Sequence, residues 1–369
     1  MAEPASIMAG LRLRSVSCIA VEVPLRYVLG TSAATVRAAP LLLVEVLTEQ
    51  GVIGRSYVFC YRRSGARSIA IVLDEAAALV CGDSVAPLAI AAKLQRRFAL
   101  LGVTGVVRMA LSALDMALWD ALAMAAATPL TCLLGGTPRP LRVYNSCGLG
   151  LMSPHAAADE AEALLGGGMK AVKLRLGYAT LAEDLSVTRA VRSRLPDAVD
   201  LLVDYNQALS RVDALARGRA LQSEGVAWLE EPIRHDDLPG NAEIARSLAL
   251  PLQLGENFDG PKAMLQALHA VACDLVMPDV ARIGGVSGWM QAAGVAEAHG
   301  IPMSSHLMPE VSAHLLAATP TCHWLEYVDW TDAIATQPVK IEDGCWPMNN
   351  RPGTGLDWDP DAVARYRIA

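Results

Sequence analysis

Three acidic residues stand at the ends of three consecutive apolar segments: Asp204, Glu230 and Glu256. Their spacing is even, because 230 − 204 = 26 and 256 − 230 = 26. This period fits one strand, one helix and two loops, the repeating unit of a (β/α)₈ barrel. Each acid is therefore predicted to lie at the C-terminal end of a parallel strand, on the face where barrel active sites form. Converging carboxylates suit Mg²⁺ and leave room for water and substrate, so the pattern indicates a metal-assisted enzyme.

The length of the chain, 369 residues, favours two domains over one. Its first third predicts a three-strand meander followed by helices, which is an α+β module. A breaker-rich junction at 135–138 follows, and strands then alternate with helices to about residue 340. We therefore predict an N-terminal α+β capping domain at 1–137, a TIM-like (β/α)₈ barrel at 138–345, and a C-terminal tail at 346–369 that packs on the cap.

The predicted elements can be placed along the chain. Cap strands are expected at 11–23, 41–47 and 56–61, and cap helices at 66–80, 87–99 and 106–126. Eight barrel strands are expected at 143–146, 171–176, 200–204, 228–230, 252–255, 275–277, 302–304 and 325–327, with helices at 287–299 and 311–318 between the last of them. Eight strands over roughly 200 residues match a compact barrel.

Other polar side chains fall at the same strand ends. Lys173 and Arg175 alternate with apolar neighbours, so both should point into the barrel. The third, sixth, seventh and eighth strands contribute, in that order, Asn206, Asp279, His306 and Glu326. Scattered surface charge would not be phased in this way, so one mouth of the barrel is expected to carry an active site.

This set of side chains could remove the α-proton of a bound carboxylate substrate. A metal ion and the cationic Lys173 would clamp a substrate carboxylate and stabilise the dianion formed when its α-proton leaves. Asp279 can hold His306 in one tautomer and make it a base near neutral pH, or it can merely cap the following helix. Glu326 can share a hydrogen bond with the enolate oxygen opposite the metal. Ser146, at the end of the first barrel strand, is a candidate contact for the substrate carboxylate.

Several stretches of the sequence together resemble one known family. They are 171–173, 176–178, 203–207, 230–232, 255–257, 277–279, 283–286, 302–307, 312–320 and 323–326. On these motifs the chain resembles a member of the enolase superfamily, in the mandelate racemase subgroup, nearly end to end. The resemblance implies Mg²⁺ as the cofactor, bound by Asp204, Glu230 and Glu256. It also implies a homo-oligomer, with octamers common in the subgroup.

The same resemblance implies roles for the remaining polar residues. Asn206 would lie near the substrate hydroxyl. The His306–Asp279 dyad would be the base on one face of the substrate, and Glu326 would be the electrophilic acid.

One position departs from the family pattern. The motif on the second barrel strand is Lys-x-Lys, whose second lysine is the base on the opposite face, but this chain has Lys173-Leu174-Arg175. A guanidinium stays protonated far above neutral pH, so Arg175 is a poor proton acceptor. A base on one face only favours α-proton abstraction followed by loss of a β-hydroxyl, the acid-sugar dehydratase reaction. Arg175 could have a role in binding, or it could equally be a purely structural ion-pair partner inside the barrel.

The residues expected around the substrate favour a different reaction. Apolar candidates for the pocket are Leu29, Val36, Phe59, Tyr61 and Leu307. Such a pocket suits an aryl or alkyl 2-hydroxy acid better than a polyol, although Arg26 and Arg37 could reach an anionic tail. We therefore predict a racemase or epimerase of a 2-hydroxy carboxylate. An acid-sugar dehydratase is the alternative, and an inactive metal- or ligand-binding homologue is a third interpretation.

Composition narrows the partners and the compartment. A net charge of −7 without a clustered basic face argues against nucleic acid, and a small-molecule carboxylate is the expected partner. The most apolar long stretch, 106–127, is interrupted by Arg108, Asp115 and Asp120, so it predicts a buried helix and no membrane span. The eight cysteines form no CxxC pair and no signal sequence precedes Arg12, which together predict a cytoplasmic protein with reduced thiols.

Overall fold

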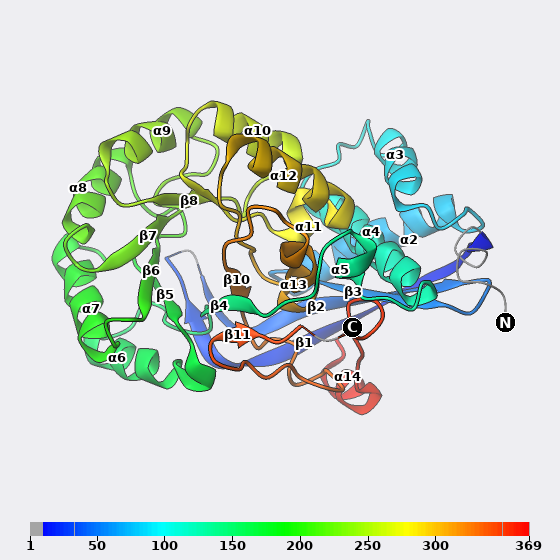
Figure 1. The fold of residues 1–369 in the computed structure, drawn as a ribbon, viewed down its shortest axis with the longest axis horizontal. Coiled ribbons are helices and arrows are strands. Elements are labelled where there is room, and N and C mark those ends of the chain that lie inside the picture. The colour runs from blue at the N-terminus through cyan, green and yellow to red at the C-terminus, as the bar shows by residue number, and fades with distance from the viewer. Residues whose placement is uncertain (1–9, 33, 349, 369) are drawn as a thin grey trace.

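The computed structural model describes residues 10–32, 34–348 and 350–368. Its first part is an antiparallel sheet in the order β1-β2-β3 with helices packed on it, beside a curved parallel sheet that helices surround (Figure 1). The elements of the first part are β1 (Leu13–Gly30), β2 (Thr35–Thr48), β3 (Ile53–Phe59), α2 (Arg63–Val80), α3 (Pro87–Arg97), α4 (Gly105–Ala125) and α5 (Leu130–Leu133).

Parallel strands and helices then alternate to form the barrel. The strands follow the order β10-β4-β5-β6-β7-β8-β9, and β4 also pairs with the antiparallel β11. The strands are β4 (Leu141–Asn145), β5 (Ala171–Arg175), β6 (Asp200–Asp204), β7 (Val226–Glu230), β8 (Leu252–Leu254), β9 (Leu275–Val276), β10 (Leu325–Tyr327) and β11 (Cys345–Trp346).

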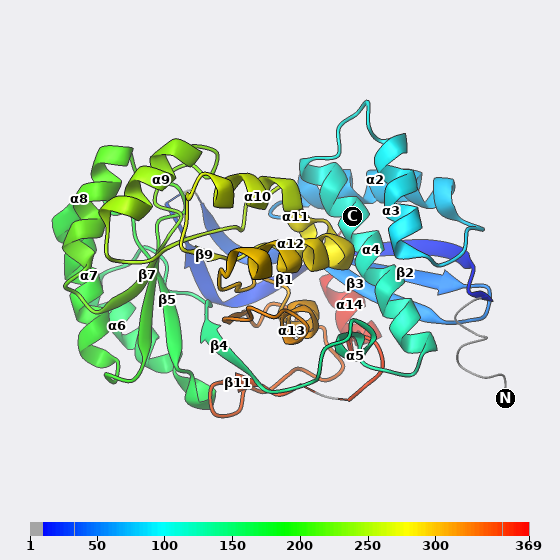
Figure 2. The same ribbon diagram turned by 45° about the horizontal axis from the view of Figure 1, so that its top comes forward.

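Helices cover the outside of this sheet (Figure 2). They are α6 (Pro154–Ala163), the short 3₁₀ turn η1 (Gly166–Gly168), α7 (Leu181–Arg194), α8 (Arg211–Leu221), α9 (Leu238–Ser247), α10 (Pro261–His269), α11 (Val280–Ile283), α12 (Gly285–His299), α13 (Pro309–Ala317) and, after the barrel, α14 (Pro360–Tyr366). The predicted TIM-like barrel with an N-terminal α+β cap is confirmed.

Local sequence signals explain how these elements form. Helix α7 begins with a capping box, in which the Thr180 hydroxyl accepts from Glu183 N at 3.2 Å and the Glu183 carboxylate accepts from Thr180 N at 2.8 Å. Every residue of β5 is buried, as is typical of parallel strands covered on both faces. Because Lys173 and Arg175 lie on this strand, their charges are buried inside the barrel.

The seventh barrel strand, predicted at 302–304, is reduced to two isolated bridges at one residue, Met303. Met303 bridges Val276 of β9 on one side and the segment just before β10 on the other. Pro302 has no N–H, so only its carbonyl joins the ladder, accepting from Val276 N at 3.1 Å. Ser304 N then donates to Val276 O at 2.8 Å. This short segment therefore closes the barrel without forming a regular strand.

The β1–β2 hairpin is longer than predicted. Pairing continues beyond a bulge that follows Pro24, and Leu29 lies opposite Val36. The prediction ended the first strand near 23, and in the structure most of the residues beyond that point are partly or fully exposed. Leu29 and Val36 therefore belong to strands and not to a loop.

The tip of this hairpin is attached to the mouth of the barrel. Leu151 N donates to Gly30 O at 2.9 Å, and Ser32 Oγ donates to Tyr205 O at 3.1 Å. In Figure 1 the hairpin reaches from the cap to the barrel strands. The cap thereby supplies part of the wall around any site at that mouth.

Two buried acids in α4 connect the cap to the rest of the chain. Asp115 accepts from Ser287 N at 2.9 Å and from Ser287 Oγ at 2.6 Å. Asp120 accepts from Arg55 N at 2.8 Å and from Thr354 N at 2.6 Å. The segment is a buried helix, as predicted. Among the described residues, no helix is both long and apolar enough to cross a membrane.

The C-terminal segment returns to the cap. Helix α14 packs against β1, and Ile368 N donates to Ala20 O at 2.9 Å. Before this, β11 pairs with β4, with Cys345 opposite Arg142. All eight cysteines are free thiols.

Candidate active site

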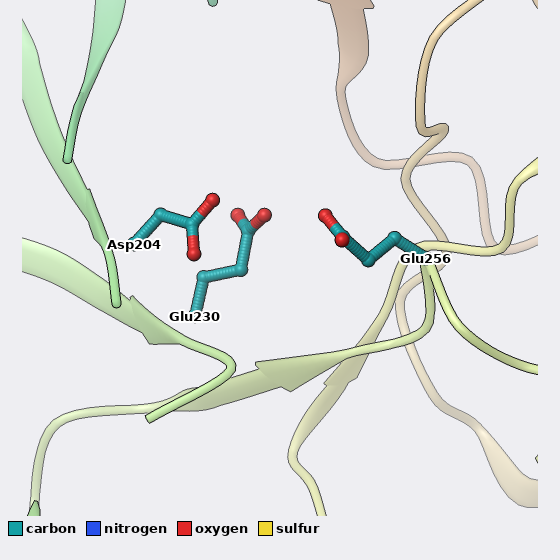
Figure 3. Close-up of side chains that lie close together, drawn as sticks. All are labelled: Asp204, Glu230 and Glu256. Carbon is teal, nitrogen blue, oxygen red and sulfur yellow. The ribbon is translucent and has the colours of Figure 1, made fainter. Parts of the chain in front are cut away.

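The three evenly spaced carboxylates converge at the ends of neighbouring strands. Asp204 ends β6, Glu230 ends β7, and Glu256 follows β8 after Gly255, whose φ is 151°. A side chain on Gly255 would lie 2.6 Å from the backbone nitrogen of Met277, so glycine is required there. Figure 3 shows the three carboxylates pointing toward one another. One oxygen from each lies within 4.8 Å of the others.

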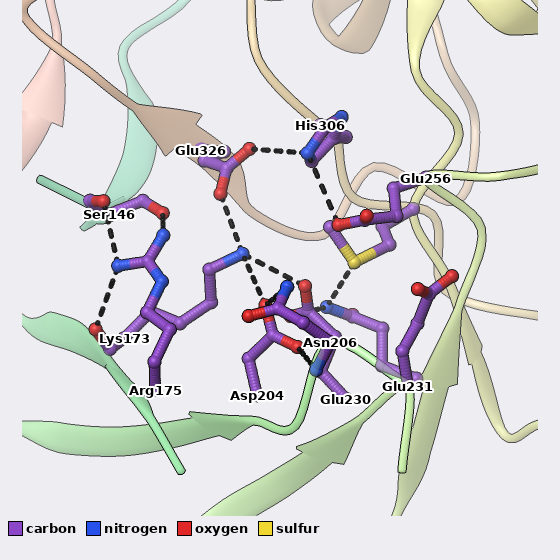
Figure 4. Close-up of polar contacts among 12 residues, drawn as sticks. Ser146, Lys173, Arg175, Asp204, Asn206, Glu230, Glu231, Glu256, His306 and Glu326 are labelled. Carbon is purple, nitrogen blue, oxygen red and sulfur yellow. Dashed lines mark hydrogen bonds and ion pairs between the residues drawn. The ribbon is translucent and has the colours of Figure 1, made fainter. Parts of the chain in front are cut away.

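Lys173 is buried among these acids. Its Nζ lies 2.9 Å from Glu230 Oε1, 2.8 Å from Glu326 Oε1 and 3.5 Å from Asp204 Oδ2 (Figure 4). Burial would lower the pKa of Lys173, but the three carboxylates outweigh it and raise the pKa above its usual value. Lys173 is therefore a fixed ammonium and not a proton acceptor.

One ammonium does not balance the charge of this cluster. Burial raises the pKa of Glu230, Lys173 opposes the rise, and Asp204 and Glu256 add to it, so that the pKa reaches about 8. A divalent cation between the three carboxylates would relieve their repulsion, and carboxylate oxygens are ligands that Mg²⁺ prefers. The donor set therefore fits a divalent metal ion.

Asp279 both caps the following helix and contacts His306, the two possibilities predicted from the sequence. Its Oδ1 accepts from Ala281 N at 2.7 Å and from Arg282 N at 3.2 Å, which caps α11. Its Oδ2 lies 2.8 Å from Nδ1 of His306. A carboxylate only accepts, so Nδ1 carries the proton and Nε2 is left facing Glu256 Oε2 at 3.3 Å. Nε2 is therefore the nitrogen that can take a substrate proton once the imidazole is neutral.

Opposing effects set the pKa of His306. Burial lowers it, whereas the carboxylates of Glu256 and Glu326 and the hydrogen bond to Asp279 raise it, to about 9 overall. A cation bound to Glu256 would weaken the largest of the raising effects. A loaded metal site therefore favours the neutral imidazole.

Glu326 is held as a carboxylate. Its Oε2 accepts from Leu307 N at 2.7 Å, while its Oε1 pairs with Lys173. Burial would raise the pKa of Glu326, but Lys173 and His306 hold it well below the usual range. In the free site this side chain is therefore an acceptor, and it can act as an acid only after it receives a proton.

Of the two roles left open for Arg175, the ion pair is not formed among the described residues. Its Nη1 donates to Ser146 O and Gly148 O, both at 2.9 Å, and its Nη2 donates to Ser146 Oγ at 2.7 Å. Backbone carbonyls thus hold the guanidinium in place. Ser146 is 1% exposed and hydrogen-bonds both Arg175 and Glu326, so it helps to fix these two side chains.

A cavity of about 360 Å³ opens over these groups. The predicted pocket residues all line it: Leu29, Val36, Phe59, Tyr61 and Leu307. Val328 and Trp330, just after β10, complete the apolar wall and were missed by the sequence prediction. Arg26 and Arg37 line two other pockets instead of this cavity.

Asn206 also lines the cavity, close to the metal-ligand candidates. Its Nδ2 donates to Asp204 Oδ2 at 3.0 Å. Its Oδ1 is buried and has no hydrogen-bond partner among the described residues. The amide oxygen could therefore accept from a ligand, and its contact with a substrate hydroxyl stays a prediction.

A chain of polar side chains behind Glu256 was missed by the sequence prediction. Arg282 Nη1 donates to Asn257 Oδ1 at 2.7 Å. Asn257 Nδ2 in turn contacts the two carboxylate oxygens of Glu231 at 3.0 and 2.9 Å, and Glu256 Oε1 at 3.3 Å. The only signal in the sequence was the acidic doublet Glu230-Glu231 and the amide next to Glu256.

Comparison with known families agrees with this geometry. The N-terminal domain model of mandelate racemase / muconate lactonizing enzyme matches residues 13–135, and the enolase C-terminal domain-like model matches residues 156–362. The chain belongs to the enolase superfamily. Within this superfamily it falls in the mandelate racemase subgroup, as the sequence motifs predicted.

Individual relatives in this superfamily cover nearly the whole chain. It is 31% identical over 318 residues to an L-talarate/galactarate dehydratase of Salmonella typhimurium, a match covering 86% of this chain and 80% of the relative. A solved enolase from an alphaproteobacterium, with bound magnesium, is 43% identical with a TM-score of 0.95, covering 97% of this chain and 100% of that one. A Bradyrhizobium enolase complexed with magnesium and mandelic acid is 36% identical with a TM-score of 0.93, covering 97% and 99%.

Proposed function

We propose that this enzyme, with Mg²⁺, removes the α-proton of a 2,3-dihydroxy carboxylate and expels the β-hydroxyl as water to give a 2-keto acid. The main support for an elimination is the difference between the two sides of the site. The His306–Asp279 dyad presents a proton-accepting nitrogen, whereas Arg175, across the Lys173 amine in Figure 4, is a guanidinium fixed by carbonyls. Racemisation needs an acceptor on each face, but elimination needs only one. The dehydratase relative supports this choice.

The proposed metal ligands are Asp204, Glu230 and Glu256. Magnesium in the two solved relatives supports this assignment. When bound, the ion supplies positive charge that offsets the negative charge developing on the substrate carboxylate as its α-proton leaves. Lys173 supplies a second positive charge from the barrel interior, where its contacts with Glu230 and Glu326 hold the ammonium in place.

His306 serves as both base and acid in this scheme. Its Nε2 takes the α-proton, and the imidazolium that results is stabilised by Oδ2 of Asp279, 2.8 Å from Nδ1. The imidazolium then gives this proton to the departing β-hydroxyl, so the proton count is balanced with a single side chain. Glu326, held as a carboxylate, accepts a hydrogen bond from a substrate hydroxyl and orients it.

Racemisation of a 2-hydroxy acid is the second candidate. The apolar cavity wall favours it, because a compact aryl acid such as mandelate would fill the wall without burying unpaired hydroxyls. The mandelic acid in the Bradyrhizobium relative supports the same idea. It requires a proton acceptor opposite His306, and Arg175 does not supply one.

A panel of acids distinguishes the two reactions. The enzyme with Mg²⁺ is incubated with aldonates, aldarates, substituted glycerates and both mandelate enantiomers, and 2-keto acids are followed as semicarbazones while chirality is followed by chromatography. We expect a 2-keto acid from at least one 2,3-dihydroxy acid and no inversion of mandelate. The variant His306→Asn should form no 2-keto acid. Inversion of mandelate without any keto acid would replace the proposal with the second candidate.

A further inference from the structure

An aromatic wall stands over the proposed reaction centre. Aromatic residues make up only 5% of the chain, yet Phe59, Tyr61 and Trp330 all line the one cavity that also contains the catalytic candidates. Two of them come from the end of the cap sheet and one from the segment after β10. The cap and the barrel therefore contribute jointly to one surface.

The three rings form a continuous stack. The centroids of Tyr61 and Phe59 are 4.5 Å apart, and those of Phe59 and Trp330 are 4.7 Å apart, which is contact distance for aromatic pairs. The guanidinium of Arg282 lies 4.8 Å from the centroid of Tyr61 and fixes that ring from another side. Tyr61 also has a φ of 60°, a backbone conformation that side chains rarely adopt. These ring and guanidinium contacts hold the wall together in the structure without a ligand.

This wall offers few partners for hydroxyl groups. Besides the aromatic rings it consists of Leu29, Val36, Leu307 and Val328. Two hydroxyls line the same cavity: that of Tyr61, which is paired with the Arg282 guanidinium, and that of Thr31, which donates to Ala34 O at 3.2 Å. The catalytic floor carries the polar groups of Lys173, Arg175, Asp204, Asn206, Glu256, His306 and Glu326. Arg62, Gln207, Asn257 and Arg282 also line the cavity, and of these Gln207, Asn257 and Arg282 already have protein hydrogen-bond partners. A polyol tail would lose its water at the wall without gaining hydrogen bonds, whereas an aromatic ring would gain contact area.

We propose that the substrate class is a 2,3-dihydroxy carboxylate carrying an aryl group on C3, and this inference rests on the proposed elimination. The carboxylate and the 2-hydroxyl would face the polar floor, and the ring would lie against Phe59 and Trp330. The class reconciles one-base chemistry, which needs a β-hydroxyl, with an apolar wall, which disfavours a sugar chain.

The reaction balances without any other reagent. In 2,3-dihydroxy-3-phenylpropanoate the bond from C2 to hydrogen breaks and the proton passes to His306. The bond from C3 to oxygen breaks, the proton leaves with that oxygen as water, and a double bond forms between C2 and C3. The enol becomes 2-oxo-3-phenylpropanoate, so substrate equals product plus one water, with no oxidant or reductant.

The first test compares unmodified enzyme on three kinds of acid with Mg²⁺ present: both diastereomers of 2,3-dihydroxy-3-phenylpropanoate, the polyols galactarate and gluconate, and 3-phenyllactate, which has the ring but no β-hydroxyl. We expect keto acid from the aryl substrate with kcat/KM at least about tenfold above either polyol, and competitive inhibition by 3-phenyllactate. Turnover of a polyol but not of the aryl acid overturns this inference and leaves the elimination standing. No keto acid from any of them removes the elimination itself.

The second test changes the wall. Phe59→Leu keeps an apolar side chain but removes the ring face, and Trp330→Leu does the same at the other end. Each should raise KM for the aryl acid by about tenfold, weaken 3-phenyllactate binding measured by calorimetry, and change kcat less. Leu100→Ala, at a fully exposed position in the cap, is the matched control and should change neither. Unchanged affinity in both wall variants, with folding verified by circular dichroism, would contradict the proposed ring position.

Discussion

Asp279 divides its two carboxylate oxygens between a helix cap and an imidazole. Oδ1 accepts the N–H groups of Ala281 and Arg282, and Oδ2 accepts from Nδ1 of His306. The cap fixes the carboxylate, and the carboxylate fixes the imidazole, so the proton-accepting Nε2 is aimed by backbone geometry. Asparagine has the same shape as aspartate but no charge, so substituting it at position 279 separates the effect on the helix cap from the effect on the imidazole.

Asp279→Asn is expected to keep the cap and lose the base. The amide oxygen can still accept from Ala281 N, while the amide nitrogen would donate to Nδ1 of His306 and leave the proton on Nε2. We expect kcat to fall by about 10⁴, as in other enzymes where the imidazole takes the wrong tautomer, with little change in melting temperature. Steady-state kinetics and thermal denaturation measure both.

Asp279→Ala is the matched comparison. It removes the cap as well as the base, so its unfolding free energy should fall by about 1 kcal/mol more than that of the asparagine variant. If the asparagine variant keeps near wild-type activity, Asp279 only caps α11 and the assignment of the dyad is wrong.

At the scale of elements, the parts of the site carried by buried strands were predictable and those carried by turns were not. Buried parallel strands give near-continuous apolar runs, so the ends of β6, β7 and the segment after β8 could be found from the 26-residue spacing. Glu231 lies in a turn with a φ of 36°, and its contact with Asn257 depends on where two loops meet in space. No periodicity in the sequence predicts a contact between two loops.

In the cap, too, irregular segments were not predicted from the sequence. The second part of the β1–β2 hairpin has mixed exposure and a bulge after Pro24, so alternation failed as a signal and the strands were predicted too short. The short bridge at Met303 arises because Pro302 lacks a donor, which a strand pattern alone does not register. Trp330 follows β10 in an irregular segment, so its place in the cavity wall could not be inferred from strand periodicity.

Asn257→Leu tests whether this missed chain positions a metal ligand. The change removes the amide that holds Glu256 Oε1 at 3.3 Å and accepts from Arg282. We expect Mg²⁺ affinity, measured by calorimetry without substrate, to fall about 10- to 100-fold. Gln266→Leu on the exposed face of α10 is the control and should bind Mg²⁺ as the unmodified enzyme does. Equal affinities for both variants would mean that Glu256 needs no such support.

At the scale of the whole molecule, single side chains connect segments that are far apart in the sequence. Nδ1 of His314 in α13 accepts from Thr131 N at 3.3 Å, and its Nε2 donates to Thr354 O at 3.1 Å. Burial lowers the pKa of His314 to about 4. An extra proton on Nδ1 would face the N–H of Thr131 and would have only the Thr131 hydroxyl, 2.9 Å away, as its acceptor, so protonation weakens the connection between barrel, cap and tail.

The stability of the enzyme should therefore decline in acid partly through His314. Because its folded pKa of about 4 lies below the unfolded value of about 6.5, the stabilisation is complete above pH 6.5 and is lost as the pH falls toward 4. His314→Asn should be less stable at pH 7 but should lose up to about 3 kcal/mol less than the unmodified enzyme over that window. Urea titrations at several pH values measure the difference. Parallel curves for the two proteins would show that His314 does not titrate in this range.

We propose that the site has one base, His306, on one face of the substrate. The most direct test is proton NMR in D₂O with Mg²⁺ and each enantiomer of mandelate, which has an α-proton but no β-hydroxyl to eliminate. One base predicts deuterium at the α-carbon of one enantiomer only, with its configuration retained, and no exchange in His306→Asn. Deuterium accompanied by inversion would mean that a second acceptor operates opposite His306, and the one-base account would have to be abandoned.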